Sequence, residues 1–191
     1  SRRRHTRYIS VTGVQTCALP ICHVGIFAHD VEKMIAFYQD VVGLTVTDRG
    51  LSSSTKSPII FMSSNPLQHH QFVIVQGRAK ETPSTVNQLS FKVDTLAELR
   101  EVAAKARSHG SALRQTSHGN AWSVYFPDPE GNQIEIYLDT PWHVAQPHGD
   151  PIDFALSDAE IFAQTEAKVR ADPTFKLKEA REAELTKILA G

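Results

Sequence analysis

The apolar positions of residues 23–42 change from a period of two to a period of 3.6. In HVGIFAHD, residues 23–30, apolar side chains at 24, 26 and 28 alternate with the other residues, which is typical of a strand. Residues 31–42, VEKMIAFYQDVV, place their apolar side chains on one face of a helix, and Asp30 precedes them as a candidate N-cap. The pattern predicts a strand followed directly by a helix.

The same pattern returns 65 residues later. In residues 87–107, NQLSFKVDTLAELREVAAKAR, apolar side chains at 89, 91 and 93 alternate with polar ones. Thr95 then opens a helix, with Glu98 at the spacing of a capping box. His23 and Gln88 occupy the same place in the two segments, and so do the two caps. A repeat of this size indicates a duplicated strand–helix unit.

Short strands with alternating apolar residues follow each helix. We expect them at 43–49, 58–63 and 70–76 in the first half, and at 111–116, 121–126 and 133–138 in the second. Each half then has the order β-α-β-β-β, and one such half cannot cover both faces of its sheet. The sequence predicts an α+β fold in which two paired βαβββ modules, residues 22–78 and 86–140, form an open barrel-like cavity, with a C-terminal helical tail.

The predicted strands separate polar from apolar side chains. We expect the apolar faces to pack on the helices and the polar faces to line the shared cavity. We also expect Tyr125, Phe72 and Trp122 to make this cavity tolerant of aromatic ligands.

Four polar residues stand at related places in the predicted strands. With the offset of 65 residues, Glu135 is the counterpart of His70, as Gln88 is of His23. Two imidazoles, an amide and a carboxylate that converge on one cavity can bind a divalent metal. The alternative is that His23 is a core or edge histidine that only satisfies a backbone carbonyl. The repeated arrangement favours the metal site.

Two segments carry a resemblance to a known family. HVGIFAHDVEKMIAFYQDVVGL and YFPDPEGNQIEI resemble the first strand and helix, and the DPxGxxxE ending, of the vicinal oxygen chelate superfamily, which includes glyoxalase I, fosfomycin- and bleomycin-resistance proteins and extradiol dioxygenases. The resemblance covers residues 22 to 140. It implies that paired modules hold a divalent metal, with His23 and Glu135 as ligands and Gln88 at the ligand position of the second module.

The extradiol dioxygenase branch is the most similar in detail. HHQFVIV resembles its HH strand, which implies that His70 is an acid–base group. WSVYF resembles a strand whose tyrosine contacts the substrate, here Tyr125, and His118 is near another active-site histidine of that branch. The resemblance implies a ring-cleaving dioxygenase that uses O₂ on a catecholic diol. Its metal would be Fe(II), with Mn(II) or another divalent ion as the alternative.

Gln88 departs from the extradiol pattern, in which this position is usually histidine. An amide oxygen is a harder donor than imidazole and suits Mn²⁺ or Mg²⁺ better than Fe²⁺. Two other functions therefore stay open: a lyase or isomerase of the glyoxalase type, and a small-molecule binding protein of the bleomycin-resistance type. The presence of both His23 and Glu135 argues against the binding protein.

Composition excludes several kinds of partner. Lysine and arginine (20) nearly balance aspartate and glutamate (21), so we expect no nucleic-acid partner. No apolar run approaches the roughly 20 residues of a membrane helix. Two cysteines are too few for a disulfide framework, which favours the cytoplasm. We expect a homodimer that binds a small-molecule substrate.

The two ends of the chain differ in pattern from the modules. Residues 1–21 are basic and lack periodicity, and we expect a non-native or disordered leader there. Residues 141–191 begin with the Pro-rich TPWHVAQPHGDP segment, and two charged helices follow, the first ending at Pro173. We expect a packing or dimer-contact tail; the alternative is a lid with Trp142 or His143 at the mouth of the cavity. His5, His109 and His148 are expected at the surface.

Overall fold

The computed structural model describes residues 21–190, so the predicted leader lies almost entirely outside the described residues. The first module begins with an edge strand and a helix that continues as one π-helical turn. Its elements are β1 (Val24–Ala28), α1 (Val31–Phe37), η1 (Tyr38–Val42), β2 (Thr45–Leu51), β3 (Pro58–Ser63) and β4 (Phe72–Gln76). They form a four-stranded sheet of order β1-β4-β3-β2, in which β1 runs parallel to β4.

The second module repeats this topology. Its elements are β5 (Leu89–Lys92), α2 (Leu96–Ser108), β6 (Arg114–Ser117), β7 (Ala121–Pro127) and β8 (Gln133–Asp139). Within a five-stranded sheet, β5 lies at one edge and runs parallel to β8. Thr95 and Glu98 form the predicted capping box at the start of α2. The predicted α+β fold with two βαβββ units is confirmed, and the two sheets are not closed into a barrel.

The strand register corrects one inference from the repeat. Val24 pairs with Phe72, whereas Leu89 pairs with Ile134. The offset is therefore 65 residues in the first strands but 62 in the last. Glu135 lies opposite Ser90 as Val73 lies opposite Gly25, so the counterpart of Glu135 is Val73. The prediction that His70 is its counterpart was wrong, because the β3–β4 connection is longer than the β7–β8 turn.

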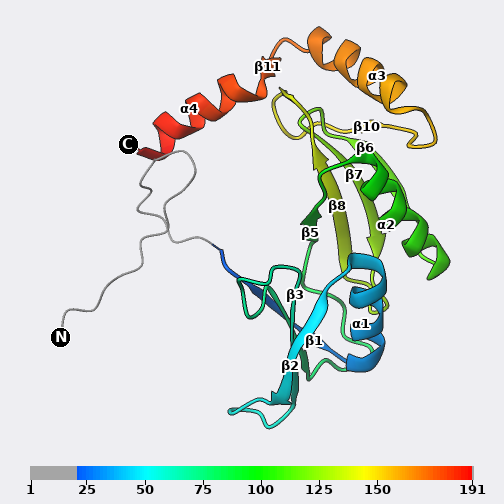
Figure 1. Cartoon of the computed structure of the whole chain (residues 1–191), viewed down its shortest axis with the longest axis vertical. Helices are drawn as coiled ribbons and strands as arrows, with labels where there is room; N and C mark the ends of the chain where they lie inside the picture. The colour runs from blue at the N-terminus through cyan, green and yellow to red at the C-terminus, as the bar shows by residue number, and fades with distance from the viewer. Residues whose placement is uncertain (1–20, 191) are drawn as a thin grey trace.

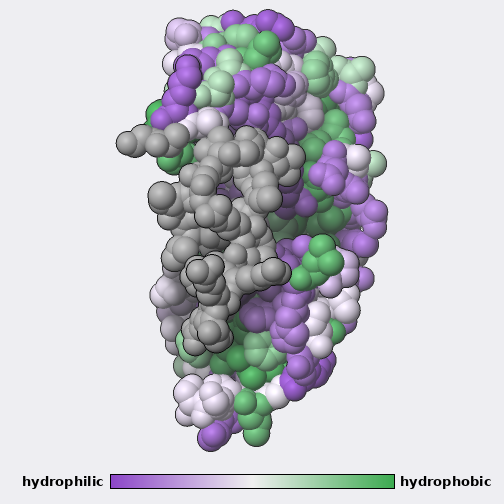
Figure 2. Space-filling view, turned by 60° about the vertical axis from the view of Figure 1, so that its left-hand side comes forward, coloured by the Kyte–Doolittle hydropathy of each residue, from purple (hydrophilic) through white to green (hydrophobic). Residues whose placement is uncertain are grey.

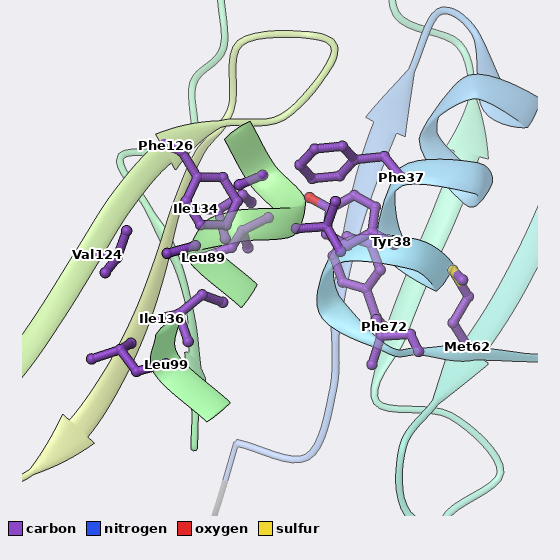
Figure 3. Packing of buried hydrophobic residues seen from close by; sticks show 14 of the residues in the cluster. Phe37, Tyr38, Met62, Phe72, Leu89, Leu99, Val124, Phe126, Ile134 and Ile136 are labelled. Carbon is purple, nitrogen blue, oxygen red and sulfur yellow. The ribbon is translucent and has the colours of Figure 1, made fainter. Parts of the chain in front are cut away.

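One hydrophobic core joins the two modules. Figure 1 shows α1 and α2 on the same side of the two sheets. In Figure 3, Phe37, Tyr38 and Phe72 face side chains of the second module across this core. The Tyr38 ring lies 4.5 Å from that of Phe72, and the Phe37 ring lies 6.3 Å from that of Phe126. Burying each such side chain contributes about 1.5–3 kcal/mol.

Polar contacts also cross between the modules. The Tyr38 hydroxyl donates to Asp128 over 3.0 Å. A carboxylate oxygen of Glu130 accepts from the backbone amides of His29 and Asp30, each over 2.7 Å, and thus holds the two residues that precede α1 from the other module. The second carboxylate oxygen lies 3.5 Å from the guanidinium of Arg78, and both side chains are only 10% exposed. The β7–β8 turn therefore ties the second module to the first.

The tail packs on the second module. It comprises β9 (Trp142–His143), β10 (Asp150–Pro151), α3 (Asp158–Ala171), β11 (Lys176–Leu177) and α4 (Lys178–Ala190). Strand β10 extends the second sheet beside β6, and β11 pairs with β9. The Trp142 side chain is buried and packs on Trp122 and Phe162, which fits the expected packing tail and not the alternative of a lid with Trp142 at the mouth of the cavity.

Candidate functional site

The second sheet turns a polar face away from α2. Pairing across the strands places Glu135 between Ser90 and Tyr125, and Arg114 beside Tyr125. The apolar residues of the same strands point the other way, into the core, because successive side chains of a strand alternate between faces. Gln88 precedes β5 and reaches the same polar group. The predicted polar face is therefore present in this module.

Glu135 is the centre of this face. Its carboxylate is buried and accepts hydrogen bonds from Ser90 over 2.6 Å, from Tyr125 over 2.5 Å and from the Gln88 amide over 3.1 Å. Burial alone would raise the pKa of Glu135, but the hydrogen bonds from Ser90 and Tyr125 hold it below its usual value. The carboxylate is therefore charged at neutral pH, and it makes no ion pair with any residue that the structure describes.

Tyr125 connects this carboxylate to a histidine. Its hydroxyl lies 2.8 Å from Nε2 of His118, and the Arg114 guanidinium lies 3.9 Å from the centre of its ring. Burial, together with the negative charge of Glu135, raises the pKa of Tyr125 to about 12. The phenol therefore keeps its hydrogen at neutral pH, and this single hydrogen lies between two acceptors, the Glu135 carboxylate and Nε2 of His118.

A backbone carbonyl fixes the orientation of the His118 ring. Its Nδ1 lies 2.6 Å from the backbone carbonyl oxygen of His148. A carbonyl oxygen has no hydrogen to give, so Nδ1 carries one and acts as the donor. The opposite ring nitrogen, Nε2, faces Tyr125 and the polar sheet face. Tyr125, His118 and Glu135 thus form one connected group.

The first module holds a separate pair of histidines. The rings of His23 and His70 lie 4.5 Å apart, and Nδ1 of His70 lies 2.9 Å from Nδ1 of His69. Burial, with His23 and His69 beside it, lowers the pKa of His70. Because the charged imidazolium is disfavoured, His70 is neutral at pH 7 and can accept a proton.

These two groups do not form one metal cluster within the described chain. Across residues 21–190, no three His, Cys, Asp or Glu side chains lie close enough together to hold a metal ion. The structure joins His23 to His70, and Gln88 to Glu135, but it does not bring the pairs together. The donors nevertheless fit a divalent cation chemically, since a buried charged carboxylate without an ion-pair partner gains most from one.

Comparison with known proteins identifies the family. The family model "Glyoxalase/Bleomycin resistance protein/Dioxygenase superfamily" matches residues 21–136, which include both modules up to Ile136 of β8. The chain belongs to the glyoxalase/bleomycin resistance protein/dioxygenase superfamily. The predicted resemblance to the vicinal oxygen chelate proteins is thereby confirmed.

Two curated relatives of this superfamily are dioxygenases. Biphenyl-2,3-diol 1,2-dioxygenase 3 of Rhodococcus globerulus is 25% identical over 126 residues, which cover 62% of this chain and 63% of the relative. Catechol-2,3-dioxygenase of Bacillus subtilis is 27% identical over 127 residues, which cover 62% of this chain and 42% of the relative. The chain therefore spans less than two thirds of either relative.

Solved structures of the superfamily share the fold. A glyoxylase/bleomycin resistance protein/dioxygenase domain from Frankia sp. EAN1pec has a TM-score of 0.54 at 17% identity, covering 64% of this chain and 99% of that domain. A genomically encoded fosfomycin resistance protein from Listeria monocytogenes, in complex with Mn(II) and sulfate, has a TM-score of 0.50 at 17% identity and covers 66% of this chain and 95% of its own. Superfamily members thus include a divalent-metal protein.

The superfamily fold in this chain has one unexpected face. The first sheet turns apolar side chains away from α1, among them Phe27, Phe61 and Val75, whereas a polar face was predicted for both modules. Figure 2, which views this side of the molecule obliquely, shows hydrophobic residues toward its lower end. Phe72 and Trp122 point into the core, so the prediction that they line the cavity was wrong.

The alternation of side chains places Ser90 on the polar face, as observed, but sequence reasoning missed two other contributors. Arg114 falls on a strand that was predicted, and the same alternation could have revealed it. His148, which was expected only at the surface, holds His118 through its backbone carbonyl, and its own Nε2 is buried. A backbone contact from a distant segment leaves no signal in the sequence.

No helix within residues 21–190 has the length and apolar character to cross a membrane.

Proposed function

We propose that this chain is a metal-dependent, ring-cleaving dioxygenase of the extradiol type that acts on a catecholic diol. The observation that carries the proposal is the connected group His118–Tyr125–Glu135, with separations of 2.8 and 2.5 Å on a polar sheet face. Two curated relatives with dioxygenase names support the same reaction class.

The metal ligands in this proposal are His23, Gln88 and Glu135. When bound, a divalent ion such as Fe(II) or Mn(II) supplies Lewis acidity and open positions for a diol and O₂. Glu135 gives the ion a charged oxygen donor, and its hydrogen bonds from Ser90 and Tyr125 hold the carboxylate in orientation.

The remaining side chains act on the substrate. His70, neutral because its pKa is lowered, accepts a proton from one hydroxyl of the diol. The Tyr125 hydroxyl and Nε2 of His118 hold the substrate oxygens, since both atoms face the polar sheet face. The apolar face of the first sheet gives the aromatic ring a surface that excludes water.

A second copy of the chain would complete the site in this proposal. His23 and Glu135 belong to different sheets, and β1 and β5 are both edge strands with free backbone groups. His23, which precedes β1, and Gln88, which precedes β5, are also exposed. Placing the first module of one copy against the second module of another would bring His23 to Gln88 and Glu135.

Metal analysis and a catechol assay test the reaction. Protein purified without chelators is analysed for bound metal, loaded anaerobically with Fe(II), and assayed with catechol and O₂ for the yellow ring-cleaved product. Glu135→Gln, which preserves shape and removes the charge, should lose most of its metal affinity and its turnover. Turnover of a hemithioacetal with no turnover of any catechol would contradict the proposal.

Mixing of inactive variants tests the second copy. His23→Ala and Glu135→Gln homodimers should each be inactive. After they are unfolded and refolded together, mixed dimers contain one site with both native residues, so about a quarter of wild-type activity should return. No recovery, with mixed dimers present by mass spectrometry, would mean that each site lies within one chain.

One observation supports a second candidate, a metal-dependent lyase or isomerase. The Gln88 amide nitrogen donates to Glu135, and the amide oxygen of Gln88 is then available to a metal. This harder donor suits Mn(II) better than Fe(II). If the loaded protein is active with Mn(II) on a non-aromatic substrate and inactive on catechols with Fe(II), this second function is the correct one.

A further inference from the structure

The active-site histidine is held by a segment outside the family match. The family model ends at residue 136, whereas the carbonyl that accepts from His118 belongs to His148 in the Pro-rich segment. This segment follows β9 and leads into β10, which pairs with β6 at the edge of the second sheet. The contact is therefore made by a residue of the tail, outside the matched residues.

Gln146 closes a ring of three hydrogen bonds around this contact. Nδ1 of His118 donates to the His148 carbonyl over 2.6 Å. The backbone amide of His148 donates to Oε1 of Gln146 over 3.1 Å. Nε2 of Gln146 then donates to the backbone carbonyl of His118 over 2.8 Å. One side chain thus fixes both the backbone of His118 and the backbone that holds its ring.

Close packing keeps the segment against the loop that carries His118. A methyl group added at Gly119 would lie 2.5 Å from a methyl carbon of Val144, so the Val144 side chain packs against the backbone of Gly119 as only glycine allows. The Gly119 carbonyl accepts from the hydroxyl of Thr140 over 2.5 Å. The backbone amide of Ala145, in the same segment as Val144, donates to the hydroxyl oxygen of Thr174 over 2.8 Å.

We propose that Gln146 is a positioning residue of the active site, and that the segment 144–150 sets the orientation of the His118 ring. With Nδ1 engaged by the His148 carbonyl, the ring must present Nε2 to Tyr125 and the substrate. The proposal rests on the proposed function, in which His118 holds a substrate oxygen. The tail then belongs to the catalytic unit, beyond the two modules that define the superfamily.

Substitution of Gln146 tests the proposal. Gln146→Met keeps the length of the side chain and removes both hydrogen bonds, whereas Gln146→Glu keeps the acceptor for His148 and removes the donor to His118. In the Fe(II)-loaded enzyme, both should lower kcat about tenfold or more and change KM less than twofold, because a misplaced group costs the transition state more than binding. Gln164→Met, an exposed residue of α3, is the matched control and should leave both constants unchanged.

A second measurement does not depend on turnover. ¹⁵N-histidine NMR above pH 8 reports which ring nitrogen carries hydrogen, and the signal of His118 is assigned by its loss in His118→Gln. The wild type should show only the Nδ1–H form of His118, and the Gln146 variants a mixture of both forms. An unchanged His118 signal in both variants would overturn the proposal, whatever happens to kcat. A changed signal in an enzyme that cleaves no catechol would instead support the positioning role and refute the proposed function.

Discussion

Tyr38 places its hydroxyl on Asp128, a carboxylate of the other module that is nearly inaccessible to solvent. Burial, with Asp128 adding to it, raises the pKa of Tyr38 far above its usual value. Asp128 also accepts from the side chain of Asn132 over 2.7 Å and from its backbone amide over 2.9 Å. The phenol is therefore a neutral donor that the folded protein does not allow to ionise.

Alkaline pH should destabilise the protein through this residue. In the unfolded chain Tyr38 ionises near pH 10, while in the folded protein it stays neutral, so its stabilising contribution is complete below pH 10 and falls as pH rises. The loss is about 1.4 kcal/mol per pH unit for each such tyrosine. Tyr38→Phe should cost about 1 kcal/mol at pH 7 and make the alkaline decline shallower. Urea unfolding between pH 7 and pH 11 measures the free energy of unfolding of both proteins. If this free energy falls in parallel with pH for the wild type and Tyr38→Phe, the prediction is contradicted.

Arg114 is a cation on the polar face that has no ion-pair partner among the described residues. Its guanidinium lies over the Tyr125 ring and donates to Thr116 over 2.8 Å, and it makes no ion pair within residues 21–190. A guanidinium carries five N–H donors, so several remain for a ligand. If the proposed function is correct, we expect a preference for diols that also carry a carboxylate.

The kinetics of Arg114 variants test this preference. With a carboxylate-bearing catechol, Arg114→Gln should raise KM about tenfold, because a charge-assisted hydrogen bond is lost. With unsubstituted catechol, the same substitution should change KM less than twofold. Thr116→Val is a milder companion that frees the guanidinium without removing its charge. Equal effects on the two substrates would show that Arg114 only supports the Tyr125 ring.

The elements follow from sequence where their residues interact locally. Asp30 caps α1 by accepting from Lys33, and Ser157 with Glu160 forms the capping box of α3, as their spacing predicts. Strand β3 begins and ends at the predicted residues. The helix over 31–42 was predicted as one piece, whereas its last turn is π-helical and ends at Gly43, which has a φ of 82°. The length of the β3–β4 connection depends on tertiary pairing, which the periodicity of one strand does not contain. The apolar open face of the first sheet could have been predicted, because residues 59–62 and 72–75 are uninterrupted apolar runs.

The start of α1 depends on a residue of the second module. Glu130 accepts from two backbone amides there and faces the buried Arg78. Glu130→Ala should therefore cost about 3 kcal/mol, since it removes two hydrogen bonds to backbone amides and leaves a buried cation without its ion pair. Glu101→Ala is the control: its exposed ion pair with Lys105 should contribute less than about 1 kcal/mol. Equal destabilisation by the two substitutions, measured by urea unfolding, would contradict this role.

At the scale of the whole molecule, the two modules share one core and several polar contacts. The predicted site residues lie in two separate groups, because alternation shows which face a side chain occupies but not how two sheets are placed. His118, Tyr125 and Glu135 meet within one sheet, where sequence reasoning is strongest. The relation of His23 to Glu135 crosses between sheets, and it remains a prediction for the mixing experiment.

The shared core predicts one cooperative unfolding transition. Both tryptophans, Trp122 and Trp142, lie in the second module and the tail, so fluorescence reports that half alone. Far-UV circular dichroism reports both modules. The two urea transitions should coincide, since neither module keeps its core without the other. A dichroism change that precedes the fluorescence change would show that the first module unfolds independently.

The longer connection between β3 and β4 has a consequence for engineering. His69 and His70 lie in it, before β4 begins at Phe72, and so outside the paired residues of the sheet. A connection of this kind can be exchanged for one of another length without resetting strand register, because pairing resumes at Met62 and Phe72. Transplanting the corresponding loop from a relative would then replace His70, the acid–base group of the proposed function, without changing the paired strands. The duplicated half offers no such freedom at Glu135, which is built into a paired strand.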